Sequence, residues 1–122
     1  MPKPDFFIVG APKCGTTSLA RYLSEHPDVF IPSGPPLEPH YFLPAAKRDP
    51  LDRETYLRLF EPGAGCRRVG EKSVWYLYGP DVPRRIAELG PAARIIVMCR
   101  SPADMLHSLH SVLLTTWTEN IE

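Results

Sequence analysis

The sequence of 122 residues predicts an α/β fold in which a parallel sheet is flanked by helices. Two short apolar runs, 6–9 and 94–99, have the pattern of strands that are buried on both faces of such a sheet. Segments with helical spacing alternate with these runs, and this alternation requires crossover connections between parallel strands. The content of 43% hydrophobic and 23% charged residues is typical of one globular domain, which we expect to span 1–122.

The first expected unit is a strand at 6–9 and a helix that begins near Gly15. The strand is wholly apolar and ends at Gly10, and Pro27 ends the helix because it disfavours helical backbone in the residue before it. One face of this helix carries three apolar residues, Leu19, Tyr22 and Leu23.

Periodic segments and loops alternate in the middle of the chain. A short strand is expected at 29–31, a proline-rich loop at 32–39, and helices at 53–60 and at about 81–89. A proline and a glycine follow each of these two helices and end it.

The clearest buried strand is expected at 94–99, and a helix follows it at once. Ser101 can cap this helix, Pro102 suits its first position and Asp104 resembles the second half of a capping box. The helix runs to about residue 116, and the sequence then stops without a closing strand, so we expect an incomplete domain. Four apolar residues of this helix are expected to face the core: Met105, Leu109, Val112 and Leu113.

Composition argues against several classes of function. Fourteen basic and fourteen acidic side chains cancel, so the overall charge indicates neither a nucleic-acid partner nor an anionic membrane surface. No apolar stretch approaches the length of a membrane span or a signal peptide, which favours a cytoplasmic protein. Three cysteines without a C-x-x-C pair argue against a structural zinc site and suit a reducing compartment.

The segment 10–17 joins the first expected strand to the first expected helix, where backbone N–H groups and the helix dipole make an anion site. The spacing from Gly10 to Gly15 matches the G-x-x-x-x-G of a P-loop, which predicts a fold like that of the P-loop NTPases. Thr16, however, stands where an ATPase or GTPase has lysine. The lysine lies inside the loop, at Lys13, where it can lean over a shorter phosphate chain.

A lysine in this place suits a donor that carries its transferable group on a single 5′ phosphate. One such donor is 3′-phosphoadenosine 5′-phosphosulfate (PAPS), and Lys13 can neutralise the charge that develops on the bridging oxygen without a metal ion. The alternative is that the two glycines only form a tight turn and that the lysine is a solvated surface residue. Pro12 and the pair Thr16-Thr17 favour the phosphate loop over this alternative.

A second motif places Arg100 at the end of the last expected strand and Ser108 two turns into the next helix. A guanidinium fork and a hydroxyl group can both bind a phosphate. Taken singly, an arginine that caps the sheet and a serine on a solvated face would explain these residues as well. Because both motifs follow strands of one parallel sheet, the fold can bring them to the same edge.

Together, P-K-x-G-T-T-x-L after an apolar strand and R-x-P-x-x-x-x-x-S resemble the two cofactor motifs of the sulfotransferase family. The resemblance is to the heparan-sulfate and bacterial carbohydrate type, and to its amino-terminal portion only. It implies PAPS as cosubstrate, no metal, and a hydroxyl or amine acceptor on a carbohydrate, a glycolipid or a small molecule. The cofactor-binding residues that it implies are Pro12, Lys13, Cys14, Gly15, Thr16, Thr17, Arg100 and Ser108.

The resemblance also implies a general base. The segment 37–42 resembles K-E-x-H-F-F, whose glutamate takes the proton of the acceptor, and this glutamate corresponds to Glu38. Leu37 departs from the pattern, because the family usually has lysine there. His40 is the alternative base, since an imidazole can do the same at neutral pH. Without the resemblance, an exposed loop carboxylate would be the simpler interpretation of Glu38.

Two lysines complete the expected catalytic set. The segment 70–74 resembles G-E-K-S/T-P, although Val74 replaces the proline, and this implies that Lys72 faces the active site. A surface lysine in a loop is an equally good interpretation of Lys72. Lys13 would stabilise the leaving phosphate during in-line transfer of the sulfuryl group.

Two other functions stay open on sequence grounds. A truncated chain can bind PAPS or another nucleotide without turnover. A P-loop kinase or NTPase is less favoured, because it needs lysine at position 16 and a metal-binding aspartate where Cys99 and Arg100 follow the last strand. A phosphatase nucleophile at Cys14 is disfavoured because Ala20 occupies the arginine position of C-x5-R. The sequence does not determine the identity of the acceptor or the oligomeric state.

Overall fold

A computed structural model describes residues 2–48 and 50–115 of the chain. Its sheet has four parallel strands in the order β2-β3-β1-β4. The strands are β1 (Phe6–Gly10), β2 (Val29–Phe30), β3 (Arg68–Lys72) and β4 (Arg94–Val97). This arrangement confirms the expected α/β class, and it places β1, which is buried along its whole length, in the interior of the sheet.

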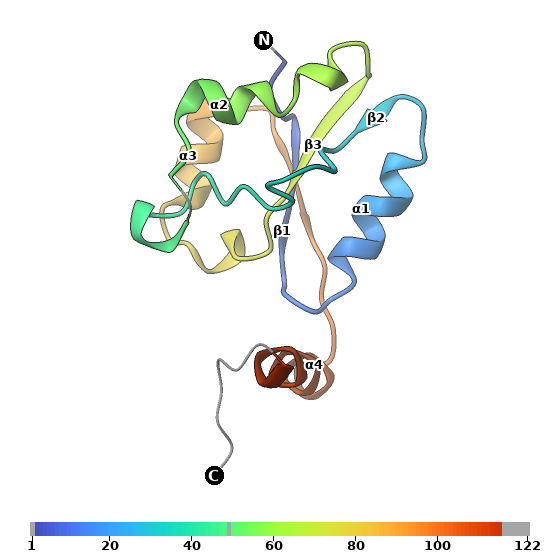
Figure 1. The fold of residues 1–122 in the computed structure, drawn as a ribbon, viewed down its shortest axis with the longest axis vertical. Coiled ribbons are helices and arrows are strands. Elements are labelled where there is room, and N and C mark those ends of the chain that lie inside the picture. The colour runs from blue at the N-terminus through green and yellow to red at the C-terminus, as the bar shows by residue number, and fades with distance from the viewer. Residues whose placement is uncertain (1, 49, 116–122) are drawn as a thin grey trace.

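Helices cover both faces of the sheet. They are α1 (Thr16–Ser24), α2 (Arg53–Arg58), α3 (Val82–Leu89) and α4 (Pro102–Thr115), with short 3-10 helices η1 (Ala45–Lys47), η2 (Glu61–Gly63) and η3 (Tyr76–Tyr78). Figure 1 shows α1 on one face and α2 and α3 on the other. Within the described residues, no helix is long and apolar enough to cross a membrane.

The alternation of side chains along β1 divides the core into two clusters. Phe7 and Val9 pack with the aromatic residues of the α2 side, among them Tyr56 and Phe60. Phe6 and Ile8 point to the opposite face, beneath α1. The central strand is therefore apolar at every position because both of its faces are covered.

The buried face of α1 is rotated about the helix axis relative to the face that the sequence predicts. Leu19 and Leu23 pack against the sheet together with Ala20, whereas Tyr22 is 68% exposed. On a helix, successive residues turn by about 100°, so the stripe that Leu19, Ala20 and Leu23 form leaves Tyr22 outside it.

The expectation of a fully buried strand at 94–99 is wrong. β4 is an edge strand that pairs with β1 alone among the described strands, and Ile95 and Val97 are 50% and 46% exposed. Ile96 packs on the α1 side of the core. An apolar run indicates that a strand can be buried, but its place in the sheet decides whether neighbours cover it.

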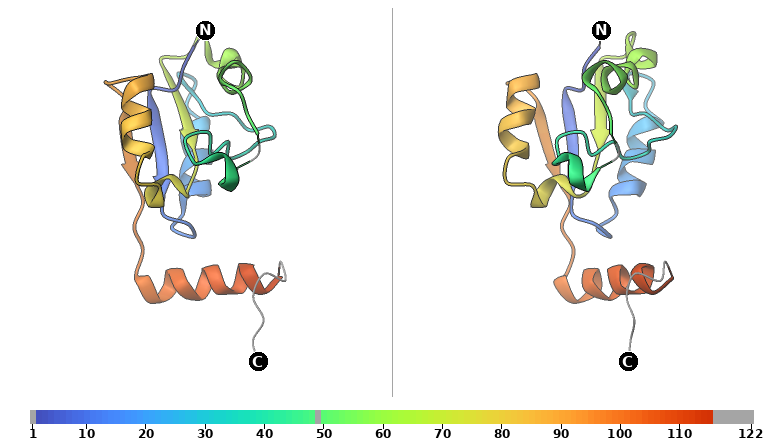
Figure 2. Two further views of the ribbon diagram at one scale, coloured as in Figure 1. Left: turned by 90° about the vertical axis from the view of Figure 1, so that its left-hand side faces the viewer. Right: turned by 60° about the vertical axis from the view of Figure 1, so that its left-hand side comes forward.

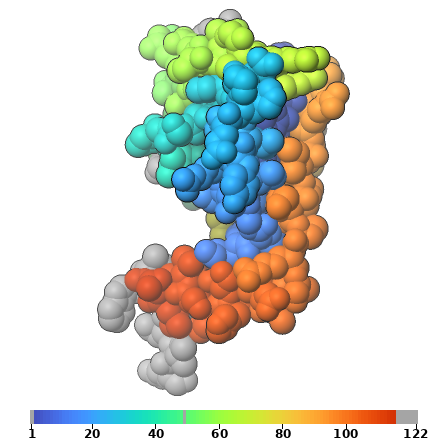
Figure 3. All heavy atoms as spheres, turned by 90° about the vertical axis from the view of Figure 1, so that its right-hand side faces the viewer, coloured from blue at the N-terminus to red at the C-terminus, as the bar shows by residue number. Residues whose placement is uncertain are grey.

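The expectation that α4 packs on the core is also wrong. None of its residues is buried, and Val112, which we expected in the core, is exposed. Figure 2 shows α4 beyond the end of the sheet, connected to it through the segment that follows β4. This position brings the amino-terminal half of α4 below the loop between β1 and α1 (Figure 3).

Candidate active site

The loop between β1 and α1 has a backbone that its two glycines allow. Gly10 has φ 145° and Gly15 has φ 80°, both in the region that favours glycine. A Cβ atom at Gly10 would also lie 2.7 Å from the carbonyl oxygen of Val74. No side chain caps the first turn of α1, so its backbone N–H groups face the loop without a side-chain partner.

This loop and α4 line an open cavity of about 260 Å³, which we call the loop cavity. Its lining combines both cofactor motifs of the sequence: Lys13, Gly15, Thr16, Thr17, Ser18, Arg100 and Ser108. The guanidinium of Arg100 donates a hydrogen bond to the carbonyl oxygen of Lys13 at 3.1 Å, which ties the two motifs together. Two cationic side chains and the amino terminus of α1 thus converge on one space, an arrangement that suits an anion.

Two residues of the predicted cofactor set lie elsewhere in the loop. Pro12 and Cys14 are buried and do not line the loop cavity. The thiol of Cys14 donates to the carbonyl oxygen of Pro12 at 3.5 Å, inside the turn. Their side chains therefore pack inside the loop and stabilise its backbone conformation.

Lys72 joins the loop to the segment that carries Glu38. It ends β3, next to the carboxyl end of β1, and its side chain is 11% exposed. Its Nζ donates to Oγ1 of Thr17 at 3.0 Å and lies 3.7 Å from Oε2 of Glu38. Lys72 is therefore no solvated surface lysine, and the two sites that the sequence placed in separate segments meet at its ammonium group.

Glu38 is held in one orientation by the chain. Its Oε1 accepts a hydrogen bond from the backbone N–H of Val74 at 3.0 Å, while Oε2 faces Lys72. The side chain is 29% exposed, so it is partly covered without being cut off from solvent. A carboxylate with one anchored oxygen and one oxygen beside a cation is well oriented to accept a proton.

His40 lies beside Glu38 and is partly buried. Its Nε2 lies 4.0 Å from Oε1 of Glu38 and accepts a hydrogen bond from the backbone N–H of Trp75 at 3.4 Å. Burial lowers the pKa of His40, and the positive charge of Lys72 acts in the same direction against the opposing effect of Glu38. The neutral imidazole that results carries its proton on Nδ1, because Nε2 is an acceptor.

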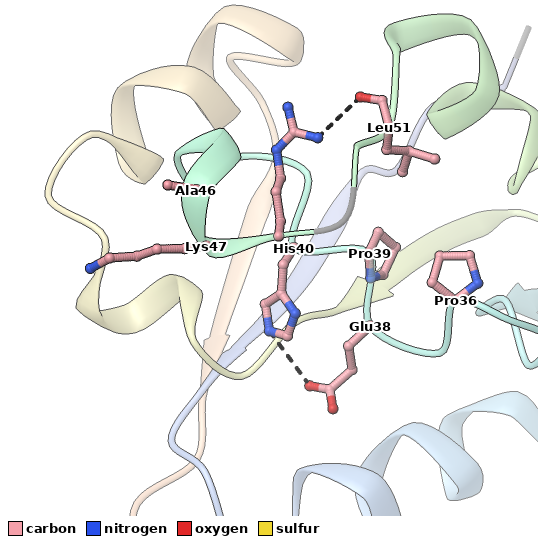
Figure 4. A pocket seen from close by; sticks show the side chains of 8 residues that line it. Pro36, Glu38, Pro39, His40, Ala46, Lys47 and Leu51 are labelled. Atoms are coloured by element: carbon pink, nitrogen blue, oxygen red, sulfur yellow. Dashed lines mark hydrogen bonds and ion pairs between the residues drawn. The ribbon is translucent and has the colours of Figure 1, made fainter.

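Glu38 and His40 also line a second cavity of about 460 Å³, which we call the His40 cavity (Figure 4). Figure 4 shows the side chains of Glu38 and His40 pointing toward one another. The other lining residues are Pro36, Pro39, Ala46, Lys47, Arg48 and Leu51. Prolines and the turn at η1 shape this cavity, and two cationic residues contribute to its wall.

Sequence reasoning missed several residues of these cavities. Ser18 lines the loop cavity, and its place in the first turn of α1 was the available signal. Lys47 and Arg48 line the His40 cavity, but no motif contains them. Among the described residues, no group of three or more metal-binding side chains occurs.

A family model and two curated relatives show which known proteins the chain is similar to. Residues 4–82 match the model of a family described as the sulfotransferase family. The chain is 31% identical over 112 residues to bifunctional heparan sulfate N-deacetylase/N-sulfotransferase 3 of Mus musculus, covering 86% of this chain and 12% of that protein. It is 32% identical over 99 residues to heparan sulfate glucosamine 3-O-sulfotransferase 6 of Homo sapiens, covering 81% and 27%.

A solved structure is similar over the whole chain. The crystal structure of a sulfotransferase from Alicyclobacillus acidocaldarius matches with a TM-score of 0.89 and 38% sequence identity. The match covers 100% of this chain and 54% of that protein. The chain thus spans about half of the solved structure and a smaller part of the curated relatives.

Proposed function

Since the chain belongs to the sulfotransferase family, we propose that it holds PAPS in the loop cavity and transfers the sulfuryl group to a hydroxyl or amine acceptor. The observation that carries this proposal is the position of Lys72. Its ammonium group contacts Thr17 of the loop and faces Glu38, so donor site and base are neighbours. Sulfuryl transfer needs this proximity, because the acceptor must attack in line with the bond that breaks.

The lining of the loop cavity supports a phosphosulfate donor. Lys13 and the first-turn N–H groups of α1 suit the 5′ phosphate end. Arg100 and Ser108, on the other wall, suit a second phosphate such as the 3′ phosphate of PAPS. When bound, PAPS supplies the activated sulfuryl group, and the residues of the chain orient it.

The proposed mechanism uses one base and two cations. Glu38 accepts the proton of the attacking hydroxyl or amine, and the new bond to sulfur forms as the S–O bond to the 5′ phosphate breaks. Lys13 stabilises the negative charge on the phosphate oxygen that leaves. Lys72, between Thr17 and Glu38, stabilises the charge on the group in transfer.

The His40 cavity is the proposed acceptor site, because Glu38 forms part of its wall. Two relatives carry heparan sulfate in their names, and a carbohydrate is the acceptor class that we propose for this chain. Lys47 and Arg48 suit the carboxylate or sulfate groups of an anionic sugar.

Two measurements test the proposal. Adenosine 3′,5′-bisphosphate should raise the melting temperature of the protein, and ATP with magnesium should not; the reverse would contradict a PAPS site. In the second measurement, labelled sulfate should pass from PAPS to a desulfated heparan oligosaccharide, and Lys13→Ala should abolish this transfer. The control for the loss of one positive charge is Arg67→Ala, because Arg67 is exposed and lines neither cavity. Binding of the bisphosphate without transfer by the wild-type chain would favour nucleotide binding without turnover.

A further inference from the structure

A buried carboxyl group precedes Lys72 in the strand that leads to the candidate site. Glu71 precedes Lys72 in β3, pairs with Phe7 of β1 and is 1% exposed. Nothing in the proposed mechanism uses it, although a buried carboxyl group is costly unless hydrogen bonds satisfy it. The groups that contact Glu71 therefore indicate its role.

Hydroxyl groups surround the carboxyl of Glu71. Ser73 donates to Oε1 at 2.7 Å and Tyr56 of α2 donates to Oε2. The hydroxyl of Tyr76 of η3 lies near the same carboxyl and favours its charged form. Burial raises the pKa of Glu71 and the charge of Glu38 adds to this effect, while the hydroxyl donors oppose it. The carboxyl thus accepts from two hydroxyl groups that come from separate segments of the chain, and a third hydroxyl group lies near it.

Two of these hydroxyl groups are themselves acceptors from the backbone of the segment 38–42. The N–H of His40 donates to Oγ of Ser73 at 3.0 Å, and the N–H of Phe42 donates to the hydroxyl of Tyr76 at 3.3 Å. A hydroxyl group that accepts in one direction directs its own hydrogen in another. One path of hydrogen bonds therefore runs from the N–H of His40 through Ser73 to Glu71, and the N–H of Phe42 is bonded to a hydroxyl group beside the same carboxyl.

The backbone that these bonds hold has a constrained conformation. His40 has φ 49°, which is uncommon for a residue with a side chain and persists only where the surroundings enforce it. The side chains of Glu38 and His40 also accept hydrogen bonds from the backbone N–H groups of Val74 and Trp75. The two segments 38–42 and 71–76 thus form one hydrogen-bonded unit, with Glu71 at its buried end.

We infer that Glu71 is a positioning residue for the proposed sulfuryl transfer. By fixing the hydroxyl groups of Ser73 and Tyr76, it holds the backbone that presents Glu38 and His40 to the acceptor. The expected effect of Glu71 on turnover rests on the proposed function. The expected effect of Glu71 on the backbone of the segment 38–42 does not depend on any activity.

Amide hydrogen exchange, followed by NMR, tests this inference in the protein. In Glu71→Gln one acceptor oxygen becomes an N–H₂ group and the carboxylate charge is lost, so the hydroxyl groups of Ser73 and Tyr76 are both held less firmly. We expect the amide protons of His40 and Phe42 to exchange at least tenfold faster than in the wild-type protein. The amide of Ser73, which bonds to Ile8 in the sheet, should keep its exchange rate.

Tyr56→Phe is the matched control, because it removes a hydrogen bond to Glu71 and leaves the contacts of Ser73 and Tyr76 with the segment 38–42 intact. It should lower thermal stability and accelerate exchange at His40 and Phe42 no more than at the reference amide of Ser73. Equal acceleration in both variants, or unchanged exchange in a folded Glu71→Gln variant, would overturn the inference. If Glu71→Gln does not fold, Ser73→Ala replaces it as the test. In that variant the amide of His40 should exchange faster than in the wild-type protein, while the amide of Phe42 should not. Unchanged exchange at His40 would contradict the inference.

Turnover provides the second measurement. Glu71→Gln should lower kcat for sulfate transfer at least tenfold, with the affinity for adenosine 3′,5′-bisphosphate unchanged. A loss of bisphosphate affinity equal to the loss of kcat would indicate general disruption and contradict a positioning role. If the wild-type protein transfers no sulfate, the proposed function fails, while the exchange rates still decide whether Glu71 holds the segment 38–42.

Discussion

The segment 38–42 and the helix α4 both carry candidate site residues, but the protein holds them by different means. The segment accepts hydrogen bonds from the N–H groups of Val74 and Trp75 and donates to the hydroxyl groups of Ser73 and Tyr76, and the aromatic core lies beneath it. Helix α4 has no buried residue, and Arg100, just before it, is tied to the loop through the carbonyl oxygen of Lys13. The proposed base is thus set by the core of the chain, whereas one wall of the loop cavity is set by surface contacts.

This difference indicates how the two sides of the site reach their geometry. A region that partly buried hydrogen bonds tie to the core opens less readily than a region held by exposed contacts, which has low local stability. The acceptor side is therefore preorganised. At the loop cavity, a bound anion that contacts both Lys13 and Arg100 would attract the two cationic side chains. This attraction would hold the loop and the start of α4 together more firmly than the exposed contacts of α4 do.

The largest expected effect is on the preorganised side. Glu38→Gln keeps the size of the side chain and its hydrogen bond from Val74 but removes the base, so we expect sulfate transfer to fall by about 100-fold or more. The affinity for adenosine 3′,5′-bisphosphate should stay within about threefold, because Glu38 does not line the loop cavity. Glu61→Gln, in an exposed turn, is the control, and unchanged transfer by Glu38→Gln would exclude Glu38 as the base.

A smaller effect of another kind is expected on the donor side. Arg100→Ala removes a cation from the loop cavity and the bond to Lys13, so we expect the affinity for the bisphosphate to fall by about 10- to 100-fold. Isothermal titration calorimetry measures this loss. Titration of Arg67→Ala corrects for the general loss of one positive charge, and equal affinities of the two variants would show that Arg100 makes no contact with the ligand.

Stability should separate the two regions as well. Tyr56→Phe leaves the buried Glu71 with one donor fewer, and we expect a loss of about 1–3 kcal/mol in the free energy of unfolding. Leu106→Ala changes an exposed residue of α4, and we expect a change within about 0.5 kcal/mol. Urea denaturation compares the two, and an equal cost would mean that α4 contributes to stability as much as the buried network does.

The smallest effect concerns pH. Burial lowers the pKa of His40 in the folded protein, so the unfolded chain binds this proton more readily. The contribution of His40 to stability is therefore complete above its ordinary pKa of about 6.5 and is lost as the pH falls below that value. His40→Gln should flatten the dependence of the melting temperature on pH below 6.5. His107→Gln, on the exposed surface of α4, is the control, and the same slope in both variants would contradict this assignment.

Much of the candidate site follows from local patterns of residues. The apolar run before Gly10, the positive φ values that the two glycines allow and the polar start of α1 define the loop without long-range information. Arg100 and Ser108 follow in the same way from a strand end and a helix. Nothing local distinguishes Lys72 from a surface lysine, because its role depends on Thr17 and Glu38, which lie in other segments.

The sequence by itself determined the alternation of strands and helices and the family, and it predicted an anion site in the loop. These features depend on hydrophobic periodicity, backbone freedom and residue type, which act over a few neighbouring positions. Only the tertiary structure decided that β4 is an edge strand among the described strands, that no residue of α4 is buried, and that a path of hydrogen bonds runs from His40 through Ser73 to Glu71. Burial and hydrogen-bond partners are decided by what the fold brings alongside a residue, and in this protein those neighbours come from segments far apart along the chain.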